Sequence, residues 1–365
     1  MFSKEEQQRY SRHFVLPGFG EEAQKRLKNS SVLVIGAGGL GAPLLQYLTA
    51  AGVGKIGIVD FDTVELSNLQ RQILFSDKDI GKSKAETSLK YLKELNPNVE
   101  FNSYPEKLTS QNAIQIIDEF DVVADGSDNF PTRYLVNDAC VLANKPLVYG
   151  SIHGFEGQCS VLNYKNGPNY RDLHPTPPDP DSVPNCAEGG VLGALAGIIG
   201  STMAVEAIKL AAGLEPGLAG KLFLFDSQHY YNDVINLGAP SPQNRVSQLI
   251  DYEVFCSGNS SNDDNIPKSV SAYELKQWIQ QQKEDIELVD VRELFERAIG
   301  HIGGIHIPLS SISSRSNEIP KKGKVVFYCS GGVRSARAIE QLMSHANYRN
   351  FYNLEGGLYE WRAES

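Results

Sequence analysis

Cysteine is scarce in this chain of 365 residues, and its pattern fits neither disulfides nor zinc. The five cysteines are widely separated, and no two of them are spaced as Cys-x-x-Cys. An odd number of scattered cysteines predicts neither a disulfide framework nor a zinc knuckle. We therefore expect a protein of the reducing cytoplasm.

Features of nucleic-acid-binding and membrane proteins are also missing. Lys and Arg number 34 against 44 Asp and Glu, a net charge of −10, so nucleic acid or an anionic membrane is a poor partner. The first residues carry no apolar segment behind their charges, which predicts that there is no signal peptide. An uncharged run of 17 residues lies between Glu188 and Glu206 and includes five glycines. We expect it to form a buried helix rather than a membrane span.

Short apolar runs alternate with helical patterns over residues 1–256, which predicts an α/β domain with a doubly wound, Rossmann-like parallel sheet. A polar stretch over residues 257–267, closed by Pro267, predicts a linker. Residues 268–365 repeat the pattern on a smaller scale and predict a second, small α/β domain. The expected strands are 32–35, 56–59, 99–104, 122–124, 146–149 and 222–225, then 287–291, 325–328 and 351–354, with helices near 272–281 and 335–345.

A glycine-rich stretch, VLVIGAGGLG over residues 32–41, joins a predicted buried strand to a predicted helix. Its glycines permit a tight turn and the close approach of a phosphate, and the N–H groups at the helix start favour anions. Asp60, at the end of the next strand, can accept hydrogen bonds from ribose hydroxyls. NAD is the first ligand that such a pattern suggests. The predicted nucleotide-binding residues are Gly36, Gly38, Gly39, Gly41 and Asp60.

Charged residues that follow the next strands favour ATP over NAD. Arg71 and Lys84 supply cations where a triphosphate would extend beyond the ribose. Asp128 supplies a carboxylate for Mg2+. Successive strands of an open α/β sheet end at the edge where ligands bind, and a dehydrogenase needs none of these groups. We therefore predict ATP and Mg2+ as cofactors.

The chain resembles the adenylyltransferases that activate ubiquitin-like sulfur-carrier proteins, the MoeB, ThiF and HesA family. The resemblance starts at RYSR over residues 9–12 and includes the glycine-rich stretch and SNLQRQ over residues 67–72. It continues through CAEGG over residues 186–190 to DYEVFC over residues 251–256. It therefore covers the whole first domain and implies a ThiF-type fold.

This resemblance also implies roles for individual side chains. Arg12 would reach the phosphates bound by a neighbouring subunit, which implies a homodimer. The other implied roles are ribose binding by Asp60, phosphate binding by Asn68, Arg71 and Lys84, and magnesium binding by Asp128.

One departure from the family concerns zinc. Many members carry two Cys-x-x-Cys pairs, but the place of the first pair reads GPNYRD over residues 167–172, and there is no second pair. We therefore expect no structural zinc, as in the zinc-free subset that includes fused, MoeZ-like enzymes. The proline-rich residues 175–180 would then form a crossover loop.

Cys329 follows a predicted strand and opens the stretch CSGGVRS over residues 329–335, after which a helix is expected. Loop N–H groups, the helix start and the charge of Arg334 are expected to stabilise a thiolate. The loop is one residue shorter than that of cysteine phosphatases and so fits a single sulfur. With LVDVR over residues 288–292 and GHIGG over residues 300–304, this domain resembles a rhodanese, which implies a Cys329 persulfide.

Cys186 precedes the predicted buried helix and has two interpretations. By resemblance it matches a cysteine that forms a covalent link with the carrier in some relatives. A small apolar residue at a helix start explains it equally well. Cys140, Cys159 and Cys256 are expected to be structural.

These observations predict a bifunctional enzyme. It would adenylylate the C-terminal Gly-Gly carboxylate of a ubiquitin-like sulfur carrier, and a Cys329 persulfide would then convert the product to a thiocarboxylate and AMP. A cysteine desulfurase or thiosulfate would supply the sulfur, in a molybdopterin, thiamine, cysteine or tRNA-thiolation pathway. The alternatives are an NAD-dependent oxidoreductase that uses the same glycine loop and an inactive scaffold that binds a ubiquitin-like protein.

Overall fold

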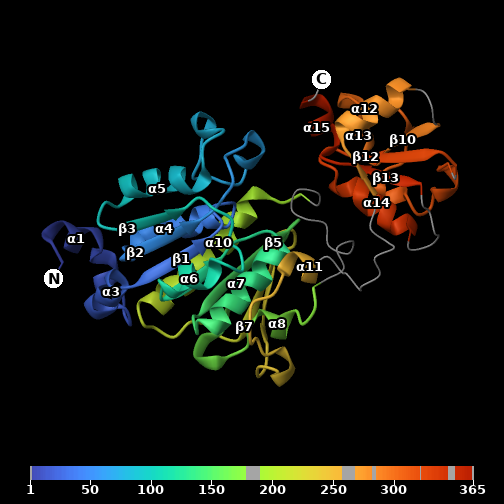
Figure 1. Ribbon diagram of the computed structural model, residues 1–365. Helices are drawn as coiled ribbons and strands as arrows, with labels where there is room; N and C mark the ends of the chain where they lie inside the picture. The colour runs from blue at the N-terminus through green and yellow to red at the C-terminus, as the bar shows by residue number, and fades with distance from the viewer. Residues whose placement is uncertain are drawn as a thin grey trace. The chain divides into compact units, whose positions relative to one another are not determined.

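The computed structural model describes residues 2–177, 190–256, 268–281, 285–320, 322–343 and 350–363. The chain divides into two compact units, Met1–Asn259 and Ser260–Ser365. Figure 1 draws the first unit from blue to yellow and the second in orange and red. The linker predicted over residues 257–267 lies outside the described residues.

The first unit contains an eight-stranded sheet with the order β3-β2-β1-β4-β5-β6-β7-β8. Strands β1 to β5 run parallel, and β6 to β8 extend the sheet in antiparallel fashion. The predicted parallel arrangement is therefore confirmed for β1 to β5 and wrong for the strand predicted over 222–225, which is the antiparallel β7, while β6 and β8 were not predicted. The strands are β1 (Ser31–Ile35), β2 (Lys55–Val59), β3 (Glu100–Tyr104), β4 (Val122–Asp125), β5 (Leu147–His153), β6 (Glu156–Leu162), β7 (Lys221–Asp226) and β8 (Tyr231–Asn236).

Helices cover both faces of this sheet because its central strands are apolar on both sides. In β1, Val32 and Val34 belong to the core on one face, and Leu33 and Ile35 to the core on the other. The helices are α1 (Lys4–Arg9), α2 (Ser11–Phe14), α3 (Gly20–Lys28), α4 (Gly41–Ala51), α5 (Lys84–Leu95), α6 (Ala113–Asp118), α7 (Phe130–Leu142), α8 (Tyr170–Leu173), α10 (Gly193–Ala211) and α11 (Tyr252–Cys256). The first core receives α3, α4, α5 and α10, and the second receives α6, α7, α8 and α11, as can be followed in Figure 1.

Helix α10 is the helix that the long uncharged run predicts. It is long and apolar enough to cross a membrane, but 50% of its most apolar window is buried within the protein. Leu195, Ile199 and Met203 pack into the first core, whereas Val205 is 55% exposed. The prediction of a buried helix is therefore right for one face of α10 and wrong for the other.

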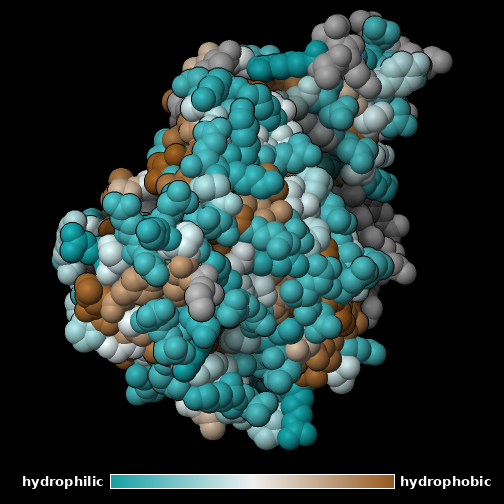
Figure 2. All heavy atoms as spheres, turned by 90° about the vertical axis from the view of Figure 1, so that its left-hand side faces the viewer, coloured by the Kyte–Doolittle hydropathy of each residue, from teal (hydrophilic) through white to brown (hydrophobic). Residues whose placement is uncertain are grey.

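Several large apolar side chains of the first unit lie on the surface. Val15, Leu16, Leu66 and Ile73 are between 50% and 74% exposed. They flank Arg12 and Arg71 in the sequence. Figure 2 shows hydrophobic groups interrupting one mostly hydrophilic face of the molecule. Exposed apolar side chains near functional residues are typical of a surface that another protein covers.

The second unit contains a five-stranded parallel sheet with the order β11-β10-β12-β13-β9. In β12, Val325 and Phe327 face one core, and Val326 and Tyr328 face the other. The three predicted strands and two predicted helices are present, and the short β9 and β11 were not predicted. The elements are β9 (Lys268–Val270), α12 (Ala272–Gln281), β10 (Ile286–Asp290), α13 (Leu294–Ile299), β11 (Ile305–His306), β12 (Lys324–Tyr328), α14 (Val333–Met343), β13 (Phe351–Leu354) and α15 (Gly357–Ala363).

Candidate functional site

The loop between β1 and α4 depends on close backbone contacts. Gly36 has a φ of 86°, a left-handed conformation that favours glycine. Its N–H donates to the carbonyl of Val59 at 2.8 Å. Gly41 starts α4 against the carbonyl of Gly36, where a Cβ atom would collide. Glycine is therefore required at both positions, which places the start of α4 beside the end of β1.

Asp60, directly after β2, is fixed by two backbone donors. The N–H of Ala37 donates to its Oδ2 at 2.8 Å, and the N–H of Asp62 donates to its Oδ1 at 2.9 Å. Burial raises the pKa of Asp60, although the charge of Lys84 and these two hydrogen bonds oppose the shift. The carboxylate is thus tied to the glycine loop.

A pocket at this edge of the sheet collects most of the predicted nucleotide residues. Among the described residues, three that were predicted to bind the nucleotide do not line the pocket: Gly41, Asn68 and Arg12. Asn68 stays within its own turn, where its Oδ1 accepts from the N–H of Glu65 at 3.2 Å. Arg12 is exposed on α2, and its role in a neighbouring subunit stays a prediction. The predicted residues in the lining are Gly36, Gly38, Gly39, Asp60, Arg71, Lys84 and Asp128.

The pocket combines cations with carboxylates. The Nζ of Lys84 lies 3.0 Å from Oδ2 of Asp62, and the lysine is buried. Arg71 donates from Nη1 to the carbonyl of Ser67 at 3.1 Å. Asp128, three residues after β4, is exposed. These groups fit a nucleotide with Mg2+, since cations bind phosphates and carboxylate oxygens bind the metal.

Arg133 also lines this pocket, and it was not predicted from the sequence. It is 8% exposed, and its Nε and Nη2 donate to the carbonyl of Ser127 at 3.3 and 3.1 Å. Burial lowers the pKa of Arg133, but the neighbouring Tyr149 and other polar groups raise it more, so the net shift is upward and the charge is retained. It lies one turn after the helix cap at Asn129, a position that carries no sequence signal of burial. The pocket thus holds a further buried cation suited to an anionic ligand.

The second site is the loop between β12 and α14. Cys329 is 2% exposed. The N–H of Gly332 donates to its Sγ at 3.1 Å, and the hydroxyl of Ser335 donates to the same atom at 3.5 Å. The N–H of Leu358 donates to the carbonyl of Cys329 at 2.9 Å, which fixes the loop to α15. Two donors on one sulfur stabilise a thiolate.

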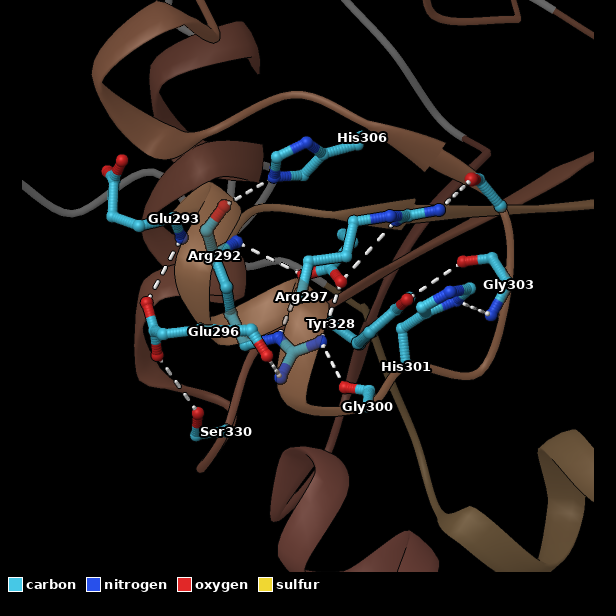
Figure 3. A network of polar contacts seen from close by, with 12 residues as sticks. Arg292, Glu293, Glu296, Arg297, Gly300, His301, Gly303, His306, Tyr328 and Ser330 are labelled. Carbon is cyan, nitrogen blue, oxygen red and sulfur yellow. Dashed lines mark hydrogen bonds and ion pairs between the residues drawn. The ribbon is translucent and has the colours of Figure 1, made fainter.

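Arg334, expected to act on this sulfur, is paired with a carboxylate that was not predicted. Its Nη1 and Nη2 lie 2.7 and 2.6 Å from the two carboxylate oxygens of Glu296. Arg334 thereby lowers the pKa of Glu296 to about 2. The hydroxyl of Ser330 lies 3.4 Å from the same carboxylate, as Figure 3 shows. The positive charge of Arg334 at the loop is therefore balanced.

The other described cysteines have the properties of structural residues. Cys140 and Cys159 are fully buried, and burial raises the pKa of both thiols. Burial also raises the pKa of Cys256 to about 11. Such thiols stay protonated at neutral pH and are poor nucleophiles. Cys186 and residues 178–180 of the expected crossover loop lie outside the described residues.

The residues at the place of the missing zinc pair have other partners. Asn169 caps α8 by accepting from the N–H of Arg171 at 2.8 Å, and Asp172 accepts from the N–H of Ser241 at 2.8 Å. Within the described ranges, no group of three His, Cys, Asp or Glu residues could hold a metal. We expect elemental analysis after dialysis against a chelator to find no stoichiometric zinc, because a structural site needs four ligands. One zinc per chain would contradict this.

Residues 10–246 match the model of the ThiF family, and residues 271–364 match that of the rhodanese-like domain. The chain is 44% identical to "Probable adenylyltransferase/sulfurtransferase MoeZ" of Mycobacterium tuberculosis, over 98% of this chain and 93% of that protein. It is 43% identical to "Adenylyltransferase and sulfurtransferase MOCS3" of Drosophila yakuba, over 97% of this chain and 82% of that protein. It is 49% identical to "Sulfur carrier protein adenylyltransferase" of Thermus thermophilus, over 70% of this chain and 98% of that protein.

Solved structures of MccB from E. coli share the fold. One gives a TM-score of 0.59 at 22% identity and covers 68% of this chain and 74% of that chain. Another, described as MccB with ATP, gives a TM-score of 0.55 at 23% identity and covers 64% of this chain and 72% of that chain. The arrangement of the part of the chain that these structures cover is thus one already seen in experimental structures.

Proposed function

Because the chain belongs to the ThiF family and carries a rhodanese-like domain, we propose that it activates and sulfurates a carrier protein. It is an ATP-using adenylyltransferase and a sulfurtransferase. It adenylylates the C-terminal Gly-Gly carboxylate of a ubiquitin-like sulfur carrier and transfers sulfur to the product. The observation that carries this function is the match to MoeZ and MOCS3 over nearly the whole chain. It rules against the oxidoreductase and the inactive scaffold.

Adenylylation by this site needs no general base, because the carboxylate of the carrier is already an ionised nucleophile. This carboxylate attacks the α-phosphate of ATP, and pyrophosphate leaves. Arg71 and Lys84 bind the phosphates and neutralise the charge that develops on them. Asp128 would hold Mg2+, which supplies further neutralisation when it is bound.

Sulfur transfer starts with the thiolate of Cys329, which takes the terminal sulfur of a donor while the rest of the donor leaves with the electron pair. The resulting persulfide attacks the acyl carbon of the carrier adenylate and expels AMP. A second thiol then cleaves the sulfur–sulfur bond, which releases the thiocarboxylate and leaves a disulfide with Cys329. By the family resemblance, Cys186 matches a cysteine that forms a covalent link with the carrier in some relatives.

The proposal includes a cytoplasmic homodimer. Arg12 is exposed and lies outside the pocket of its own chain, so it is available to a second copy. The exposed Val15, Leu16, Leu66 and Ile73 supply apolar surface that a second copy would cover. The scattered cysteines support a reducing compartment. Light scattering is expected to give twice the mass of the chain, and the mass of a single chain would contradict the dimer.

The test of the function uses the full-length protein and a carrier that ends in Gly-Gly. We expect exchange of labelled pyrophosphate into ATP only when the carrier is present. With cysteine desulfurase and L-cysteine added, the carrier should exchange one oxygen for sulfur, which mass spectrometry detects. Absence of exchange with every Gly-Gly carrier, together with NAD binding, would overturn the assignment.

A further inference from the structure

Glu296 is the carboxylate that faces the cation of the sulfur-transfer loop. Two guanidinium nitrogens of Arg334 bind its two oxygens at 2.6 and 2.7 Å, a bidentate geometry. The side chains of Arg334 and Glu296 are 21% and 20% exposed, so water screens the pair only in part. Nη2 of Arg334 also lies 3.4 Å from the hydroxyl of Ser330, the residue directly after Cys329. The carboxylate therefore balances the charge of Arg334, whose guanidinium lies beside the residue that follows the reacting cysteine.

The helix that carries Glu296 is itself held in place, as Figure 3 shows. Arg292 is 4% exposed and donates to the carbonyls of Glu296 and Gly300 at 3.3 and 2.9 Å. Its guanidinium also binds both oxygens of the buried Asp290 at 2.9 and 2.7 Å. The N–H of Glu293 donates to Oε2 of Glu296 at 3.0 Å. The negative charge is thus fixed at one position relative to the loop.

We propose that Glu296 determines which sulfur donor the Cys329 loop accepts, disfavouring thiosulfate and favouring a persulfide carried by a protein. This inference rests on the sulfur transfer proposed above and selects between its two donors. Thiosulfate carries two negative charges and gains most from a net positive loop. A persulfide on a protein carries at most one charge, and the protein that bears it supplies the binding surface. A carboxylate that neutralises Arg334 therefore weakens the binding of thiosulfate more than the binding of a protein-bound persulfide.

Both reactions at Cys329 balance without any further reagent. The thiolate attacks the outer sulfur of thiosulfate, the sulfur–sulfur bond breaks, and sulfite leaves with the electron pair. With a cysteine persulfide, the thiolate attacks the outer sulfur in the same way, and the thiolate of the donor cysteine leaves. The two donors differ in the charge that must approach the loop and in the charge that leaves it. Glu296 acts on this difference and is a positioning and specificity-determining residue.

The test compares the full-length protein with Glu296→Gln, which keeps the size of the side chain and removes its charge. The KM for thiosulfate should fall about tenfold, because the charge of Arg334 is then no longer balanced. It is measured through the formation of thiocyanate from cyanide. The difference should narrow as salt is added, because ions screen it. Loading of Cys329 by a cysteine desulfurase should not improve, and pyrophosphate exchange should stay unchanged.

The matched control is Glu293→Gln, which removes a charge from the same helix end and leaves the Arg334 pair intact. It should keep the KM of the wild type for thiosulfate. An unchanged KM in Glu296→Gln, an equal fall in Glu293→Gln, or an equal gain in desulfurase loading would overturn the inference.

Wild-type protein provides a test that does not depend on how a variant folds. Because the loop pair is neutral, the KM for thiosulfate should change less than about twofold between low and high salt. A steep rise with salt would show an unbalanced cation at the site and contradict the inference. If wild-type protein takes sulfur from neither donor, the proposed sulfur transfer fails as well. If it takes sulfur and Glu296→Gln keeps its donor preference, this inference alone fails.

Discussion

Replacement of Cys329 by alanine is expected to abolish sulfur transfer to the carrier while pyrophosphate exchange continues at the rate of the wild type. Among the described cysteines, no other sulfur accepts hydrogen bonds from both a backbone N–H and a hydroxyl. Loss of a reacting nucleophile lowers a rate by at least about a thousandfold. Mass spectrometry of the carrier, incubated with ATP, desulfurase and L-cysteine, measures the thiocarboxylate directly.

Cys256→Ala is the control for this experiment. Its thiol is half-buried and has a raised pKa, so both half-reactions should persist without it. Full thiocarboxylate formation by Cys329→Ala would mean that sulfur arrives by another route. Cys186 would then be the first thiol to replace.

Removal of a charged group from the pocket is expected to slow adenylylation strongly. Arg71→Ala and Asp128→Ala should each reduce carrier-dependent pyrophosphate exchange by about a hundredfold or more, the usual loss when one stabiliser of developing charge is removed. Sulfur transfer from thiosulfate to cyanide should remain, because it uses the Cys329 loop of the second unit and none of the residues that line the pocket. The comparison of the two assays on the same preparation separates a local loss from misfolding.

Lys90→Ala and Asp77→Ala are matched controls for these two variants. Both side chains are exposed, carry the same charges and lie outside the pocket lining. Their exchange rates should stay within about twofold of the wild type, as is usual for surface substitutions. Equal losses in the controls would mean that the net charge of the domain, rather than the pocket, governs adenylylation. An unaffected Asp128→Ala would remove this residue as a magnesium ligand.

The central part of the fold could be predicted because its strands are buried on both faces. A run such as Val32 to Ile35 is apolar at every position. Such a run is typical of a parallel strand that helices cover on both faces. Strand β8 (Tyr231–Asn236) could not be predicted in this way, because all of its residues are exposed and its polar side chains hide the pattern. Strand β11 has two residues, too few to form a pattern.

Site residues that stand beside a recognisable motif could be predicted, whereas Glu296 and Arg133, which lie within helices away from any motif, could not. Asp60 and Asp128 follow β2 and β4, and the ends of parallel strands meet at one edge of the sheet. Glu296 lies 38 residues before its partner Arg334, and only the tertiary structure brings them together. Arg133 was missed because a buried arginine within a helix resembles an ordinary surface residue in the sequence.

The contacts that hold the pocket side chains also affect what nucleotide binding costs in conformational entropy. Asp60 is fixed by two backbone N–H groups, Lys84 by Asp62, and Arg133 by the carbonyl of Ser127. A long side chain that is ordered only when a ligand arrives reduces affinity by roughly 0.5–1.5 kcal/mol. Here that ordering takes place when the chain folds. More of the interaction energy with the phosphates is therefore available for stabilising the transition state of adenylyl transfer.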